Sequence, residues 1–396
     1  MKQPKGFWTL FCIGVLERFS YYGMRVLILF YMIQALQLPA RHVGRIYGWY
    51  MGLFVVLPLV GGIIADRFTG ARKAVTIGAI LLIAGYLSLI IKIAPVLYFA
   101  LALILFGSSL FRPGFFVMVG SLYGKNDARM DGGFTLLMLS THIGSFCAPL
   151  VCGYVGEKLG FHYGFTIAGI GMITALHLYN RLVLKISENP VEASVEQSSG
   201  KSGLKTVLLF MLFALVFLCI SDSLPITSWI LQNTGSVKIN LLTFTLIITA
   251  ILYALVAMVA WLWSALGSRN KNPSAPVKFA MGFGMLSFGF AVILIVKNFM
   301  ASVSTSWIIT GFVIFTVAEL CIIPTLRSMI MHFAPRNMLS TLMGLSIFIT
   351  ALGSSIVGAM DLTYTNVTMI SILVLTAGLA FLMIVLPKNL KLGDAR

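Results

Sequence analysis

Long apolar runs, separated by short polar stretches, follow one another along nearly the whole chain. Each run has about 20 residues or more and is continuous rather than alternating, which is typical of bilayer-spanning helices and not of membrane barrels. The expected spans are residues 7–36, 44–65, 71–93, 96–123, 132–156, 163–187, 204–232, 239–264, 277–297, 304–332, 338–360 and 366–387. We therefore expect an all-α polytopic membrane protein with twelve transmembrane helices.

One polar stretch of low complexity, SENPVEASVEQSSGKSGLK, follows the sixth span and has the composition of a linker. Six spans, a linker and six more spans are the plan of a major facilitator transporter, in which two six-helix bundles surround a site near the middle of the membrane. We expect an N-terminal bundle over 1–186, a cytoplasmic linker over 187–205 and a C-terminal bundle over 206–396.

The composition supports a membrane protein and explains the net charge. The chain is 59% hydrophobic and 10% charged, which is too apolar for a soluble globular protein. A net charge of +16 is also typical of nucleic-acid binding, but eighteen cations, Lys278 among them, fall in loops expected on one side and six on the other. This bias follows the positive-inside rule. We expect an integral protein of a bacterial inner membrane with both termini in the cytoplasm, surrounded by lipid, and no nucleic-acid partner.

The first span carries Glu17, Arg18 and Arg25 at mid-depth. Each charge costs roughly 2.5–3.5 kcal/mol there on insertion scales, so it should face a polar cavity or a partner. On a helix these three residues and Tyr21 fall within about 100° of arc and share one face. Two arginines exceed what one carboxylate can neutralise, which favours an anionic ligand; a structural ion pair is the alternative.

The other ionisable residues within the spans are divided between the halves. Bases lie in the N-terminal half (Arg18, Arg25, Arg112), and acids lie in the C-terminal half (Asp222, Glu319). That polarity suits a small zwitterion, because arginine can grip a carboxylate bidentately and a carboxylate can accept an ammonium group.

Three further residues have more than one interpretation. His142 in the fifth span is either a cavity residue or a proton carrier, since histidine titrates near neutral pH. Asp66 lies in a short turn, GGIIADRFTGARK, which matches the superfamily's loop signature; it should contact the other bundle in one state and release it in another. Arg327 is interpreted as a snorkelling or gate residue.

Several motifs in order resemble the proton-dependent oligopeptide transporter family of the major facilitator superfamily. The first span has GVLERFSYYG (14–23), against the family hallmark E-x-x-E-R-F-x-Y-Y-G. The run RPG (112–114) resembles the family's Lys-Pro-Asn element, the run 131–157 is similar to its helix 5 signature, and ELCIIP (319–324) resembles Glu-Leu-Cys-x-Ser-Pro. The resemblance covers nearly the whole chain.

The resemblance implies a role for each matched residue. Arg25 and Arg112 would bind a peptide carboxylate, Glu319 would receive its amine, and Glu17 with Arg18 would couple protons and gating. The expected substrate-binding residues are Tyr21, Tyr22, Arg25, Arg112, His142 and Glu319. The expected proton-coupling or gating residues are Glu17, Arg18, Asp66 and Asp222.

Departures from the family pattern leave alternatives open. Gly14 stands where the hallmark has its first Glu, Arg112 replaces Lys, and His142 replaces a pocket Asn. The leading hypothesis is a secondary active transporter that imports di- or tripeptides, or a related small zwitterion, with protons. An uncoupled facilitator, or an exporter of another amphiphilic carboxylate or amino acid, is the first alternative, and a non-transporting sensor is the second. We expect a monomer without enzyme activity, cofactor or metal.

Overall fold

The computed structural model of the chain is made of helices and describes residues 3–124, 127, 129–187, 201–222, 241–269, 271–299, 305–358 and 366–389. The first half contains α1 (Phe7–Phe30), η1 (Tyr31–Ala35), α2 (Ala40–Ile64), η2 (Ala65–Thr69), α3 (Gly70–Ser88), α4 (Ala94–Gly120), α5 (Met130–Ala148), η3 (Pro149–Gly153), α6 (Tyr154–Lys158) and α7 (Phe161–Ser187). The second half contains α8 (Lys201–Asp222), α10 (Leu241–Ser268), α11 (Ala275–Phe299), α12 (Thr305–Phe333), η6 (Arg336–Met338), α13 (Leu339–Gly358) and α14 (Asn366–Asn389).

The described helices coincide with the predicted spans to within a few residues at most ends. Nine segments of the described ranges are long and apolar enough to cross a membrane, and one of them joins α2 with α3. The part of the predicted seventh span from residue 223 onward lies outside the described residues, as does 188–200 of the predicted linker. The rest of that linker, from Lys201, is the start of α8.

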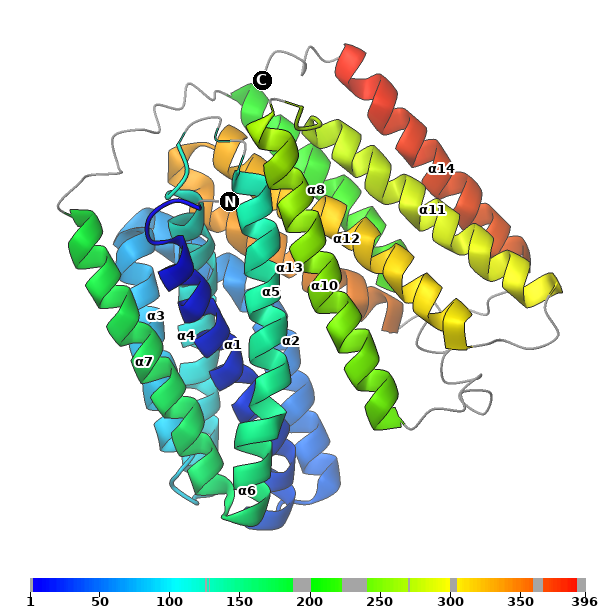
Figure 1. Cartoon of the computed structure of the whole chain (residues 1–396). Helices are drawn as coiled ribbons and strands as arrows, with labels where there is room; N and C mark the ends of the chain where they lie inside the picture. The colour runs from blue at the N-terminus through cyan, green and yellow to red at the C-terminus, as the bar shows by residue number, and fades with distance from the viewer. Residues whose placement is uncertain are drawn as a thin grey trace.

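Helices pack mainly within their own half. In the first half α1 packs on α5 and α7, and α3 packs on α4 and α7. In the second half α11 packs on α12 and α14, and α8 packs on α12 and α13. The halves meet where α2 and α4 contact α13 and where α5 contacts α10 and α12 (Figure 1).

Prolines inside α2, α4 and α12 each remove one backbone hydrogen bond from their helix. They are Pro58, Pro113 and Pro324, and all three are buried. A membrane helix tolerates such a break where neighbouring helices or a polar site compensate for it. Two of these prolines lie near positions expected to bind ligand: Pro113 directly follows Arg112, and Pro324 lies about one and a half turns beyond Glu319.

The halves approach most closely on the side of the molecule at which α1 begins and α7 ends, here called the terminus side. A Cβ added to Gly62 would lie 2.3 Å from the Ser340 carbonyl oxygen, and one added to Gly344 would lie 2.2 Å from the Pro58 carbonyl oxygen. A larger residue at either glycine would therefore push α2 and α13 apart. On the opposite side the starts of α10 and α12 diverge from α2 and α6 (Figure 1).

Candidate functional site

Glu17 and Arg18 form a closed ion pair in the middle of α1. Arg18 donates from Nε and Nη2 to the two carboxylate oxygens of Glu17. The two side chains are only 7% and 5% exposed, with Arg18 the more exposed. Adjacent helical residues point about 100° apart, so these long side chains must bend toward each other. The pair neutralises itself and leaves Arg25 as the unmatched cation of this helix.

Arg25 turns away from Glu17 and toward α2. Its Nε donates a hydrogen bond of 3.1 Å to the Tyr47 hydroxyl, and its guanidinium lies 5.9 Å from the centre of the Tyr22 ring. Within the described part of the chain, Arg25 has no ion pair with a carboxylate. Sharing a helix face with Glu17 therefore does not bring the two together. A half-buried guanidinium held by a phenol and a ring remains able to bind an anion.

Arg112 of α4 faces an aromatic pair contributed by α1 and α2. Its guanidinium lies 5.4 Å from the Phe54 ring centre. Phe54 stacks on Tyr21 at 4.6 Å with an interplanar angle of 14°, and Arg18 lies 5.3 Å from the Tyr21 ring centre. Like Arg25, Arg112 has no ion pair with an acid of the described ranges. The structure thus brings Arg18 and Arg112 together around the stacked rings of Tyr21 and Phe54.

Arg327, interpreted from the sequence as a snorkelling or gate residue, follows Glu319 by eight residues, about two turns of α12. It lies within the electrostatic range of Glu319 and of Arg112. The Arg327 guanidinium lies 4.3 Å from the centre of the Phe116 ring, which belongs to α4 in the other half. The Arg327 side chain therefore reaches the other half rather than the membrane surface, and its role as a gate residue stays a prediction.

His142 and Asp222 are placed less directly. The backbone oxygen of His142 accepts a 3.0 Å hydrogen bond from the Tyr253 hydroxyl, which links α5 to α10. The His142 imidazole is half-buried and has no hydrogen-bond partner among the residues that the structure describes. Asp222 is the last residue of α8, and its side chain lies outside the described residues. Neither position assigns a proton-carrying role.

Asp66 joins the two halves on the terminus side. Its carboxylate accepts hydrogen bonds from the backbone N–H of Ser340 at 2.9 Å and of Thr341 at 2.7 Å, and from the Thr341 hydroxyl at 2.7 Å. These N–H groups belong to the first turn of α13, where helical N–H groups have no partner in the helix and the dipole favours an anion. The predicted contact with the other half is present in this state.

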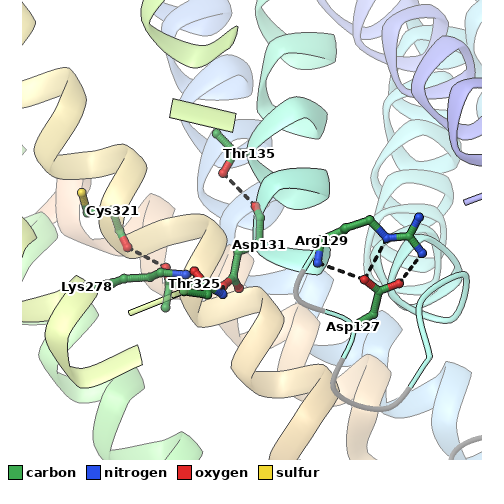
Figure 2. A network of polar contacts seen from close by, with 8 residues as sticks. Asp127, Arg129, Asp131, Thr135, Lys278, Cys321 and Thr325 are labelled. Carbon is green, nitrogen blue, oxygen red and sulfur yellow. Dashed lines mark hydrogen bonds and ion pairs between the residues drawn. The ribbon is translucent and has the colours of Figure 1, made fainter. Parts of the chain in front are cut away.

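A second link on the terminus side was not predicted. Lys278 of α11 donates to the carboxylate of Asp131 in α5, and Asn272 donates to the same oxygen at 3.1 Å (Figure 2). The Lys278 ammonium also lies 4.6 Å from the Trp263 ring centre. The expectation that Lys278 is a loop cation is wrong, because α11 begins at Ala275 and the residue is fully buried. The Asp131 carboxylate offsets the cost of burying the Lys278 ammonium group.

Sequence reasoning also missed Tyr47, which contacts Arg25, and Phe54, which contacts Arg112. Both lie on α2, with Tyr47 three residues before Tyr50 and Phe54 four residues after it. Residues at this spacing share one face of a helix. An aromatic face within an otherwise aliphatic span was therefore the available signal.

Comparisons with known proteins place this arrangement in a family. A family model described as Major Facilitator Superfamily matches residues 10–358. The chain belongs to the Major Facilitator Superfamily. The expected all-α polytopic fold of two six-helix bundles is thereby confirmed, and the chain is a membrane transporter rather than an enzyme.

Individual relatives also confirm the narrower resemblance to peptide transporters. The chain is 26% identical over 437 residues to "Peptide transporter YePEPT" of Yersinia enterocolitica, covering 88% of this chain and 86% of that protein. It is 34% identical over 267 residues to a "Di-/tripeptide transporter" of Lactococcus lactis, covering 63% of this chain and 52% of the relative. A crystal structure of a POT family transporter with a thioalcohol-conjugated peptide matches with a TM-score of 0.65 at 22% identity, over 98% of this chain and 97% of that one, which shows the shared fold.

Proposed function

We propose that this superfamily member is a secondary active transporter that imports di- or tripeptides, or a related small zwitterion, together with protons by alternating access. The observation that carries the proposal is the pair of guanidiniums, Arg25 and Arg112, that lack an acid partner within the described residues. Arg112 and Arg18 lie around the stacked Tyr21–Phe54 pair, and Arg25 follows Tyr21 by about one turn of α1. The relatives named as peptide transporters support the same substrate class.

Arg25 and Arg112 would hold the carboxylate of the substrate. Tyr47 and the rings of Tyr22 and Phe54 orient both guanidiniums without neutralising them. A carboxylate could therefore gain charge-assisted hydrogen bonds from either arginine without first breaking an ion pair. Tyr21 and Tyr22 would form the adjoining wall, since Tyr21 stacks on Phe54 and contacts Tyr22 edge-on.

Glu319 would receive the substrate amine from the opposite half. Since α12 packs against α4 and α5, a ligand held by arginines of the first half and by Glu319 would bridge the two halves. Such bridging favours the state in which both sets of groups lie close, which is how a ligand shifts a conformational equilibrium.

Coupling would depend on the Glu17–Arg18 pair. A substrate carboxylate that draws the Arg18 guanidinium toward Tyr21 and Arg112 would remove the positive charge that keeps Glu17 ionised. Glu17 would then take up a proton, because an isolated buried carboxylate is far more costly than a neutral carboxyl group. Binding of substrate and of a proton would thus favour each other.

The terminus side would face the cytoplasm, because basic residues are concentrated in its loops. The closed contacts of Asp66 and Asp131 would then seal the cytoplasmic side, and substrate would enter from the opposite side. Release into the cell would require both contacts to break. We place the protein as a monomer in a bacterial inner membrane.

An uncoupled facilitator or an exporter remains the second candidate, favoured by Gly14. A Cβ at this position would lie 2.7 Å from the Ser140 hydroxyl oxygen of α5. The packing of α1 on α5 therefore leaves no room for a carboxylate where the family hallmark has one. Proton coupling in this chain would have to proceed without that group.

Uptake of a labelled dipeptide into proteoliposomes tests both candidates. An inward proton gradient should accelerate wild-type uptake, whereas Glu17→Gln should exchange substrate across the membrane without responding to the gradient. Arg25→Ala should lose affinity for the dipeptide but not for its C-terminal amide. Wild-type uptake that is indifferent to the gradient would favour the facilitator, and equal affinity for dipeptide and amide would rule out the arginine clamp.

A further inference from the structure

Arg327 is a half-buried cation that binding of a simple zwitterion does not use. Its Nε is buried and has no hydrogen-bond partner among the residues that the structure describes. Its guanidinium stacks on Phe116, one helical turn beyond Arg112 on α4. A cation–π contact of this kind stabilises the group but leaves its hydrogen-bonding capacity and its charge unmatched.

The charges around the proposed site do not balance for a neutral ligand. Arg25, Arg112 and Arg327 each lack an ion pair with an acid in the described ranges, while Glu17 and Arg18 cancel each other. The acids that remain in the expected site are Glu319 and Asp222. Three cations thus face two acids at most. A zwitterion brings one charge of each sign and leaves this surplus of positive charge in place.

We infer that the transporter prefers peptides with an acidic side chain, and that Arg327 binds that second carboxylate at the α4–α12 contact. The inference rests on the proposed peptide transport and names a substrate class within it. The surplus positive charge favours a ligand of net charge −1 over a neutral one. The unpaired Nε of Arg327 and its two terminal nitrogens can present the paired donors that a carboxylate accepts.

The position of Arg327 separates this second anion from the proposed clamp. Arg327 lies about 12 Å along α12 from Glu319 at 1.5 Å per residue, toward the terminus side. A dipeptide backbone spans about 7 Å when extended. With the amine at Glu319 and the terminal carboxylate at Arg25 and Arg112, a side chain that points toward the terminus side is the part of the ligand directed at Arg327.

Matched peptides test the inference in proteoliposomes at pH 7.5, where a side-chain carboxyl group is ionised. The probes are Ala-Glu against Ala-Gln and Glu-Ala against Gln-Ala, which differ in charge but hardly in shape. Wild type should show at least one pair in which the acidic peptide has a half-saturation concentration about tenfold lower, as expected for one added charge-assisted interaction. Arg327→Leu should reduce this ratio to near one while Ala-Gln uptake stays within about twofold.

Arg41→Leu is the matched control, because it removes the same charge from an exposed position at the start of α2 and should leave the ratio unchanged. Equal wild-type affinity for acidic and neutral peptides would overturn the inference while leaving peptide transport intact. Failure to take up any of the four peptides would instead overturn the proposed function. Equal losses for all peptides in Arg327→Leu would show a structural role or a share in the terminal clamp, and would also overturn the inference. If Arg327→Leu does not fold, Arg327→Gln replaces it as the test of the arginine's role. The wild-type ratio by itself decides whether the transporter prefers acidic peptides.

Discussion

The ion pair between Asp131 and Lys278 should control how firmly the terminus side stays closed. Its side chains are 14% and 1% exposed, and they belong to α5 and α11, one in each half. Lys278→Met removes the ammonium but keeps most of the side-chain volume. The Asp131 carboxylate then stays buried in the closed state, with the side chains of Asn272 and Ser328 as its remaining donors. In an open state the same carboxylate would be hydrated.

The expected effect on the closed state is large. Removing one partner of a buried ion pair typically costs about 3–5 kcal/mol, because the other charge is left uncompensated. The hydrogen bonds that Asp131 keeps from Asn272 and Ser328 place the cost of Lys278→Met toward the lower end of this range. A change of about 3 kcal/mol alters the ratio of closed to open molecules by more than a hundredfold. The double variant Asp131→Asn with Lys278→Met leaves no buried charge and should recover most of this difference, giving a strong coupling in a double-mutant cycle.

Distances between spin labels measure this shift. Labels at Lys73→Cys and Arg269→Cys, both exposed on the terminus side but in different halves, would report its opening in a background without the native cysteines. The control is Asp127→Asn, which breaks an ion pair of the same side with Arg129 (Figure 2). The Arg129 side chain is 42% exposed, so this pair contributes about 1 kcal/mol or less.

The single variants should lengthen the inter-label distance, and the double variant and the control should not. An unchanged distance in both Lys278→Met and Asp131→Asn would refute the reasoning, as would an equal change in Asp127→Asn. Burial raises the pKa of the Asp127 carboxyl, but the hydrogen bonds and charge of Arg129 lower it more, so it lies below its usual range. The control pair therefore stays ionised at the neutral pH of the measurement, and its small contribution would be lost only as the pH falls through that lowered pKa.

Three further predictions test other contacts of the structure. Asp66→Asn should weaken the closed state by about 2 kcal/mol, because a neutral amide replaces a carboxylate that accepts hydrogen bonds from the start of α13. The same spin labels should then report opening of the terminus side, and an unchanged distance would contradict this prediction. Gly14→Ala should lower the melting temperature, because its Cβ would lie 2.7 Å from the Ser140 hydroxyl oxygen, and adding Ser140→Ala should restore it. Tyr47→Phe should weaken dipeptide binding about fivefold by freeing Arg25, with little effect on the C-terminal amide; equal effects on both ligands would contradict this role.

Much of the fold was predictable because membrane insertion imposes simple rules on sequence. Apolar runs of the right length and a polar break after the sixth run were enough to place most helices, and the loop around Asp66 indicated a contact between halves. The partner of Asp66 was not predictable. The N–H groups of Ser340 and Thr341 that bind it are backbone groups, and any sequence would supply them at the start of a helix.

The site was predictable in its residue types but not in its pairings. A helical wheel placed Glu17 with both arginines of α1, yet Arg18 alone bonds to Glu17, and Arg25 bonds to a tyrosine of α2. Side-chain rotamers and neighbouring helices decide such choices, and neither is visible in a single helix. Lys278 is a second residue whose pairing the sequence does not reveal. A lysine near the end of an apolar run favours a loop position, and only the fold reveals that Asp131 lies opposite it.

The closed contacts explain how the terminus side can be both specific and reversible. A large apolar interlock would stabilise one state strongly and slow the exchange that transport needs. Here glycines at backbone contact distance, one carboxylate on a helix start and one buried ion pair add to the apolar contacts between the halves. A buried ion pair contributes little net stability relative to apolar packing, since desolvation offsets its attraction, yet a mismatched partner is heavily penalised. Such contacts define a single closed geometry while keeping the free energy of opening small enough for binding of one small ligand to reverse it.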